Sequence, residues 1–119
     1  LLADLVPGDL EQILDNLLAN ALDASPEGSR ISVSVETDRS RTIRVHVTDE
    51  GRGMSEEERS RAFDRFWQGP NSNGGHSGLG LSIVRQLASR NRAAIELRQA
   101  QPAGLDAVLS LTGAESGAG

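Results

Sequence analysis

The sequence predicts a two-layer α/β sandwich, in which helices cover one face of a mixed, mostly antiparallel sheet of about five strands. Apolar residues recur at three- and four-residue spacing in 10–23 and 79–90, which predicts two amphipathic helices. Strict alternation in 31–35 and 43–48 predicts two half-buried strands. Two more strands are predicted over 94–98 and 107–111, and the end of a further strand over 1–6. The 119 residues suit one domain, which we assign to 1–112, and we expect 113–119 to be a disordered tail.

The composition excludes several classes of protein. With 12 basic and 17 acidic residues the net charge is −5, so we expect no nucleic-acid partner and no direct membrane contact. The chain has no cysteine, which excludes disulfides and cysteine-based metal sites. All 12 basic residues are arginine, which excludes a Walker-type loop because that loop needs a lysine. No apolar run approaches the ~18 residues of a membrane span. The chain starts at Leu1, and we interpret it as a fragment of a longer protein.

Three polar residues share one edge of the first predicted helix. Asp9 is expected to be its N-cap. Asn16, Asn20 and Asp23 lie within about 60° of one another at ~100° per residue, beside the apolar face. We call these three residues the asparagine edge. Such asparagines are commonly surface residues or a local hydrogen-bonding pair. Their amide oxygens are also ligands that Mg²⁺ accepts.

The strand over 43–48 ends in Asp49-Glu50-Gly51-Arg52-Gly53-Met54. An Asp-x-Gly-x-Gly run is often a plain turn. An aspartate at a strand end can also accept a hydrogen bond from an exocyclic amine such as that of adenine, while glycines let the flat base approach the backbone. His46 falls on the face opposite Val45 and Val47, where we expect a solvent-side or helix-edge residue and not a catalytic one.

A short helix over 56–63 is predicted by a capping box formed by Ser55 and Glu58. The three aromatic residues of the chain, Phe63, Phe66 and Trp67, follow within five residues. They predict either a small satellite core or an anchor for a mobile lid. The segment 69–77 is rich in Gly, Asn and Ser and supports no regular structure.

The run Gly78-Leu79-Gly80-Leu81 leads directly into the second amphipathic helix. Two glycines allow a tight turn, and the helix N-terminus that follows offers unpaired N–H groups to an anion. A turn followed by a helix explains the same residues without a ligand. Together with the asparagine edge and Asp49, the run indicates a nucleotide site.

The four clusters, in this order, resemble the N, G1, F and G2 boxes of the ATP-binding catalytic domain of sensor histidine kinases. That domain has the Bergerat fold of the wider superfamily of gyrases, chaperones, histidine kinases and mismatch-repair ATPases. The resemblance runs from about Asp9 to Leu111, nearly the whole chain. It implies ATP and Mg²⁺ as cofactors.

The resemblance also implies a role for each matching residue. Asn20 would be the Mg²⁺ ligand, with Asn16 one turn earlier supporting the phosphates or the metal. Asp49 would recognise adenine. The remaining expected nucleotide contacts are Asp23, Gly51, Gly53, Met54, Phe66, Ser77, Gly78, Leu79, Gly80 and Leu81, with Phe63 and Phe66 seating the lid and Arg65 a candidate for phosphate charge.

Two departures concern phosphate charge. Asp23 stands where many of these kinases have a lysine, and Gln68 where the lid commonly has arginine. Both changes favour greater reliance on Mg²⁺. The ATP-hydrolysing members resemble one another in carrying a glutamate as general base at the position of Asn16. Because an amide cannot take a proton from water, hydrolysis would have no general base at this position.

The resemblance therefore favours a protein-histidine kinase. The expected partners are ATP, a histidine-bearing dimerisation domain of the parent protein and a response regulator receiver domain. We expect a cytoplasmic domain whose parent is anchored in the bacterial membrane, and no self-labelling by this fragment. A clamp-type ATPase, a related protein-serine kinase and a non-catalytic nucleotide-binding module are the alternatives.

Overall fold

The computed structural model describes residues 5–64, 80–101 and 103–112. Helices and strands follow one another in the order α1 (Asp9–Ala24), β1 (Ile31–Thr37), β2 (Thr42–Asp49), α2 (Glu56–Arg61), α3 (Gly80–Arg90), β3 (Ala94–Gln99) and β4 (Leu105–Thr112). Each of these elements falls where the sequence predicts it, with ends that differ by a few residues. None of the helices in the described segments is long and apolar enough to cross a membrane.

The strands form one sheet in the order β1-β2-β4-β3. All pairings are antiparallel, with Val45 opposite both Val35 and Leu109. Within the described residues the sheet thus has four strands and no parallel pair, which agrees with the predicted mostly antiparallel sheet and differs slightly from the expected count of about five strands. The expected strand end at 1–6 accounts for the difference, because 1–4 lie outside the described residues and Leu5 and Val6 are not in a strand.

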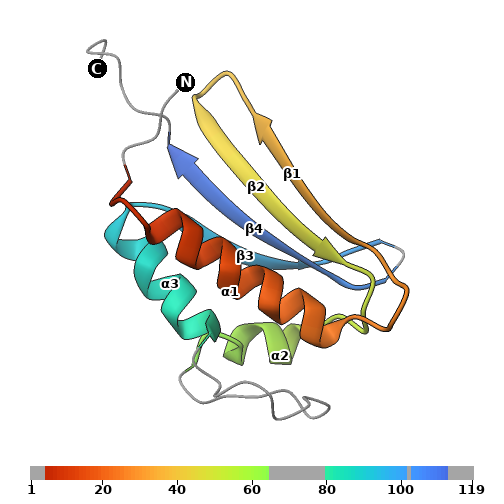
Figure 1. The fold of residues 1–119 in the computed structure, drawn as a ribbon. Helices are drawn as coiled ribbons and strands as arrows, with labels where there is room; N and C mark the ends of the chain where they lie inside the picture. Colours follow the sequence, from red (N-terminus) through yellow and green to blue (C-terminus); the bar gives the residue numbers. More distant parts are fainter. Residues whose placement is uncertain (1–4, 65–79, 102, 113–119) are drawn as a thin grey trace, which may run out of the picture.

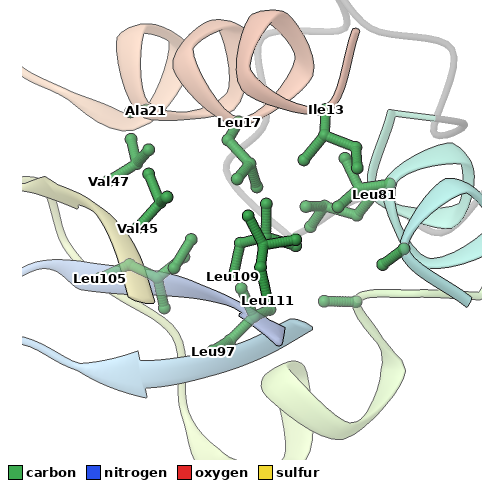
Figure 2. Packing of buried hydrophobic residues seen from close by; sticks show 14 residues of the cluster. Ile13, Leu17, Ala21, Val45, Val47, Leu81, Leu97, Leu105, Leu109 and Leu111 are labelled. Atoms are coloured by element: carbon green, nitrogen blue, oxygen red, sulfur yellow. The ribbon is translucent and has the colours of Figure 1, made fainter. Parts of the chain in front are cut away.

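The helices lie on one face of the sheet, as the two-layer prediction requires (Figure 1). Figure 2 shows Ile13, Leu17 and Ala21 of α1 pointing towards side chains of the sheet. The buried cluster is completed by Val45, Val47, Ala62, Leu81, Val84, Ala88, Leu97, Leu105, Ala107, Leu109 and Leu111. Alternate residues of β2 and β4 enter this core, since neighbouring side chains on a strand point to opposite faces.

Strand β1 lies at the edge of the sheet, where the helix layer does not cover it (Figure 1). Val33 and Val35 pair with Val47 and Val45, which places them on the helix side. Yet they are 53% and 63% exposed. The prediction that this strand is half-buried was therefore wrong in the described structure. Alternation identifies the face that a residue occupies but not whether a helix reaches it.

The start of α1 differs from the prediction. Gly8 is the N-cap, with φ of 86°, and Asp9 is the first helical residue. The Asp9 carboxylate accepts hydrogen bonds at 2.7 Å from Nε and Nη2 of Arg90 and from Nδ2 of Asn91. It therefore joins the start of α1 to the end of α3 instead of capping its own helix. These bonds, that from Arg90 first, hold the pKa of Asp9 below its usual value.

Replacing Asp9 by Asn should lower the melting temperature near neutral pH, because the Arg90 guanidinium loses its charged partner. A carboxyl whose pKa is depressed on folding stabilises the fold above its unfolded-state pKa, and this contribution disappears as the pH falls through the folded-state value. The difference between wild type and Asp9→Asn in thermal melts should therefore shrink between about pH 7 and about pH 3. Glu11→Gln, in the same turn but without a described ion pair, is the control. Equal melting temperatures at neutral pH would contradict the role given to Asp9.

Helix α2 begins as predicted. Ser55 accepts a hydrogen bond from the Glu58 N–H, and Glu58 accepts one from the Ser55 N–H, which confirms the capping box. The helix ends at Arg61, before the expected Phe63. Phe63 packs against the core, and the Arg85 guanidinium lies 5.6 Å from the centre of its ring. Phe63 thus joins the end of α2 to α3, and its expected role in seating a lid stays a prediction.

Candidate functional site

Asp49 is the last residue of β2 and the central carboxylate of the candidate site. It is only 2% exposed. Its Oδ1 accepts hydrogen bonds from the N–H of Gly51 at 2.8 Å and of Leu105 at 3.2 Å. Oδ2 accepts none of the hydrogen bonds found within the described residues. The fold therefore holds the carboxylate in place through one oxygen and leaves the other for a further donor.

Gly51 and Gly53 occupy positions where a side chain does not fit. A Cβ on Gly51 would lie 2.4 Å from the Ala24 carbonyl oxygen and 3.1 Å from Asp49 Oδ1. Gly53 has φ of 71°, and a Cβ there would lie 2.8 Å from the Gly104 carbonyl oxygen. The loop after Asp49 thus touches both the last turn of α1 and the turn between β3 and β4. Its glycines are required for this close approach.

Gly104 is a residue of this site that was not among those predicted from the sequence. Its φ is 103°, and a Cβ on it would lie 2.0 Å from the Asp49 carbonyl oxygen. Its own carbonyl accepts a hydrogen bond from the Ala100 N–H at 3.0 Å, which closes the turn before β4. The sequence marks a turn around Gly104, but its approach to Asp49 depends on β4 pairing beside β2.

The asparagine edge of α1 lies next to the buried face of the helix, as predicted. Asn16, Asn20 and Asp23 are all partly exposed, whereas Ile13, Leu17 and Ala21 are buried. Asn16 Nδ2 is buried, and among the described residues it is the one side-chain nitrogen or oxygen in that state without a hydrogen-bond partner. A buried amide without a partner is costly in a folded protein, so an acceptor from a ligand or a water would relieve it.

The asparagine edge also suits the metal implied by the resemblance. Asn20 offers an amide oxygen, and none of the hydrogen bonds found within the described chain uses it. Mg²⁺ prefers oxygen ligands and takes few of them from protein, keeping waters and phosphates for the rest. No group of three or more His, Asp or Glu residues in the described part could hold a metal alone. The donors present therefore fit a Mg²⁺ ion that is shared with a bound nucleotide.

Met54 and the start of α3 complete the described part of the site. The Met54 carbonyl accepts a hydrogen bond at 2.6 Å from Arg59 Nη1, which ties α2 to the loop after Asp49. The Met54 side chain is partly buried against the core. Helix α3 begins at Gly80, and Leu81 is buried, so a contact of Leu81 with a nucleotide would use its backbone. The expected site residues Arg65, Phe66, Ser77, Gly78 and Leu79 lie outside the described residues.

The arrangement defines a class of binding site. A buried carboxylate ends a central strand, glycines let the backbone pass close beside it, and amide side chains lie on the neighbouring helix. A carboxylate oxygen without a partner suits an exocyclic amine, and glycines admit a flat ring close to backbone. These features are those of an α/β nucleotide-binding domain.

Residues 6–114 match the sequence model described as histidine kinase-, DNA gyrase B-, and HSP90-like ATPase. The chain belongs to this family of ATPases. The superfamily predicted from the four boxes is therefore confirmed.

Curated relatives place the chain in the histidine kinase branch. It is 41% identical over 106 residues to the sensor protein CreC of Escherichia coli K12, which covers 88% of this chain and 22% of that protein. It is 44% identical over 92 residues to the histidine protein kinase SaeS of Staphylococcus aureus strain USA300, covering 74% of this chain and 26% of SaeS. The chain thus spans about a quarter or less of the length of these relatives.

Solved structures agree with this placement. The mycobacterial sensor histidine kinase MprB superposes with a TM-score of 0.80 at 30% identity, covering 87% of this chain and 71% of that one. The ATP-binding domain of PrrB from Mycobacterium tuberculosis gives a TM-score of 0.71 at 28% identity, covering 92% and 71%. The predicted fold and the predicted class, the ATP-binding catalytic domain of a histidine kinase, are both confirmed.

Proposed function

We propose that this domain binds ATP together with Mg²⁺ and transfers the γ-phosphoryl group to a histidine on a dimerisation domain of its parent protein. The parent then passes the group to a response regulator receiver domain. In this proposal the domain acts in the cytoplasm, and its parent is anchored in the bacterial membrane. The observation that carries the nucleotide part is the Asp49 carboxylate, held through Oδ1 and free at Oδ2 among the described groups.

Asp49 would recognise adenine through Oδ2. The N–H groups of Gly51 and Leu105 fix the carboxylate, so Oδ2 would accept a hydrogen bond from the exocyclic amine without reorganisation. The glycines of the loop would keep side chains away from the bound ring, and Gly51 also allows the loop to pass close to the Ala24 carbonyl oxygen. Guanine has a carbonyl at the place of that amine, so the same carboxylate would disfavour it.

The edge of α1 would handle the phosphate end. Asn20 would hold Mg²⁺ through its amide oxygen, and Asn16 would turn its unpartnered Nδ2 towards a phosphate oxygen or an ordered water. When bound, the metal ion offsets negative charge on the phosphates. Gly53, Met54 and Gly80 would shape the rest of the pocket, and we extend the proposal to the undescribed Arg65, Phe66, Ser77, Gly78 and Leu79.

Asn16 favours phosphoryl transfer over hydrolysis. An amide cannot act as a general base at neutral pH, so this side chain cannot activate a water. Catalysis would be positional and electrostatic, with the attacking histidine supplied from elsewhere. His46 cannot be that histidine, because both of its ring nitrogens contact carboxylates in the sheet.

Two measurements test this function. Isothermal titration with ATP, with and without Mg²⁺, should show binding that Mg²⁺ strengthens, and absence of binding in both conditions would exclude the kinase function. Radiolabelled ATP should label a separately supplied dimerisation domain of a relative at its histidine. Steady phosphate release by this domain alone, without labelling of the acceptor, would instead support the clamp-type ATPase.

Gly80→Ala should weaken nucleotide binding while leaving the fold intact. A Cβ on Gly80 would meet no described atom within 4 Å, so the free energy of unfolding should be unchanged or slightly higher. In the proposed site, backbone N–H groups at this helix start face phosphate, and a methyl group there should cost about tenfold in affinity. Urea unfolding and ATP titration measure the two effects, with Ser89→Ala on the exposed side of α3 as control. Equal affinity would place the phosphates away from Gly80.

A further inference from the structure

The face of the sheet turned away from the helices carries a histidine between two carboxylates. The side chain of His46 on β2 is only 16% exposed. Its Nε2 lies 2.8 Å from Oε1 of Glu36 on β1, and its Nδ1 lies 3.0 Å from Oδ2 and 3.2 Å from Oδ1 of Asp106 on β4. One imidazole ring therefore connects three strands. The prediction that His46 lies on the face opposite the core is confirmed, but the residue is not simply solvated.

The geometry defines the protonation state of this ring. Ionised carboxylates only accept hydrogen bonds, whereas a neutral imidazole has one N–H and one lone pair. A neutral ring would satisfy one carboxylate and turn a lone pair towards the other. Both contacts are made together only by the imidazolium. The same contacts, with Glu36 first and Asp106 next, raise the pKa of His46.

The other charged residues on this face have partners of their own. On β2, Arg44 Nη1 lies 3.0 Å from Asp38 Oδ2. On β3, Arg98 Nη2 lies 2.9 Å from Glu96 Oε1. Arg98 is near enough for Asp106 and Glu36 to contribute to the raised pKa of its guanidinium, but no hydrogen bond between Arg98 and Asp106 is found in the described residues. Among these residues, His46 is thus the cation that hydrogen-bonds Asp106.

The contacts of His46 with Asp106 lie close to Asp49, on the opposite face of the sheet. The Thr48 hydroxyl donates a hydrogen bond to Asp106 Oδ1 at 2.9 Å, and the two residues are opposite each other in the pairing of β2 with β4. The next residue of β2 is Asp49, and the residue before Asp106 is Leu105, whose N–H holds Asp49 Oδ1. Neighbouring residues on a strand face opposite sides, so one step along each strand leads from the outer contacts to the site carboxylate.

We propose that His46, Asp106 and Thr48 are positioning residues for Asp49, and that protonation of His46 makes nucleotide affinity depend on pH. The inference rests on the proposed function, because it requires Asp49 to contact the nucleotide. With His46 protonated, Asp106 is held by both His46 and Thr48, and β2 and β4 are fixed where Leu105 supports Asp49. As the pH rises and the ring loses its proton, Asp106 or Glu36 loses its donor and this support weakens.

The test compares ATP affinities from about pH 6 to about pH 9 for the wild type, His46→Gln and His46→Arg. Wild-type affinity should fall about fivefold across this range, at the low end of coupling between linked sites. His46→Gln should bind at the weaker level throughout, and His46→Arg, permanently charged, at the tighter level. The ratio of wild-type to His46→Gln affinity at each pH cancels the effect of the titration of ATP itself, because that titration affects both proteins equally. The midpoint of the ratio should match the pKa of His46 measured by NMR.

Arg44→Gln is the matched control, since it removes a positive charge from the same strand and face without touching Asp106. It should keep the wild-type pH profile. Asp106→Asn removes the charge but leaves an oxygen that can accept from Thr48, and it should flatten the dependence of ATP affinity on pH. This variant tests the inference if His46→Gln does not fold. A profile unchanged in His46→Gln or in Asp106→Asn would overturn the inference, even if melting temperatures fall. Wild-type protein that binds no ATP at any pH would overturn the proposed function instead.

Discussion

Asp49→Asn should weaken ATP binding strongly while the domain stays folded. The amide of asparagine keeps an oxygen that can accept from Gly51 and Leu105, so the loop and the start of β4 keep their hydrogen bonds. The second carboxylate oxygen is replaced by an NH₂ group, which would face the exocyclic amine of adenine donor to donor. Losing the acceptor and burying an unpaired donor should cost about 100-fold in affinity, or ~2.7 kcal/mol.

Titration calorimetry measures this loss, and urea unfolding checks the fold. Asp15→Asn, on the exposed side of α1, makes the same chemical change away from the site and should leave both quantities unchanged. ATP affinity within twofold of wild type for Asp49→Asn would show that the base does not contact this carboxylate. A marked loss of stability without change in affinity would limit Asp49 to a structural role.

Asn20→Ala should remove the part of nucleotide binding that depends on Mg²⁺. Alanine is the better helix former, so α1 should remain intact. Loss of a direct ligand should lower metal affinity by at least what loss of an outer-shell partner costs, on the order of 10- to 100-fold. Titrations with Mg²⁺ and with a chelator should therefore give nearly the same ATP affinity for the variant, whereas the wild type should bind more tightly with Mg²⁺.

Gln12→Ala is the control for Asn20→Ala, because Gln12 is an exposed residue on the same helix. It should keep the full effect of Mg²⁺. If Asn20→Ala also keeps it, the metal is held by other groups, and Asp23 and Asn16 become the first positions to replace.

Local signals in the sequence predicted most of the fold and part of the site. The capping box of α2 and the position of Asp49 after an alternating strand depend on neighbouring residues, and the structure confirms both. The four boxes indicated the family because their order and spacing are specific. The ligand roles of Asn16, Asn20 and the lid residues stay predictions.

The features that were missed depend on contacts between distant segments. Asp9 meets Arg90, which lies 81 residues further along the chain, and this partner outweighs its preference for capping α1. Exposure of Val33 and Val35 depends on the position of β1 at the sheet edge. The role of Gly104 depends on strand order, and that of His46 on carboxylates brought from two other strands.

Three backbone segments meet around Asp49, which limits the substitutions that related proteins can carry at this site. The space between the end of α1, the loop after β2 and the turn before β4 is bounded by carbonyl oxygens, against which a Cβ on Gly51, Gly53 or Gly104 would lie within 3 Å. Substitution at these glycines cannot tune selectivity, because every other amino acid adds the same clashing carbon. Differences in nucleotide preference between relatives should therefore arise at the asparagine edge of α1 and around Met54, where side chains line the site.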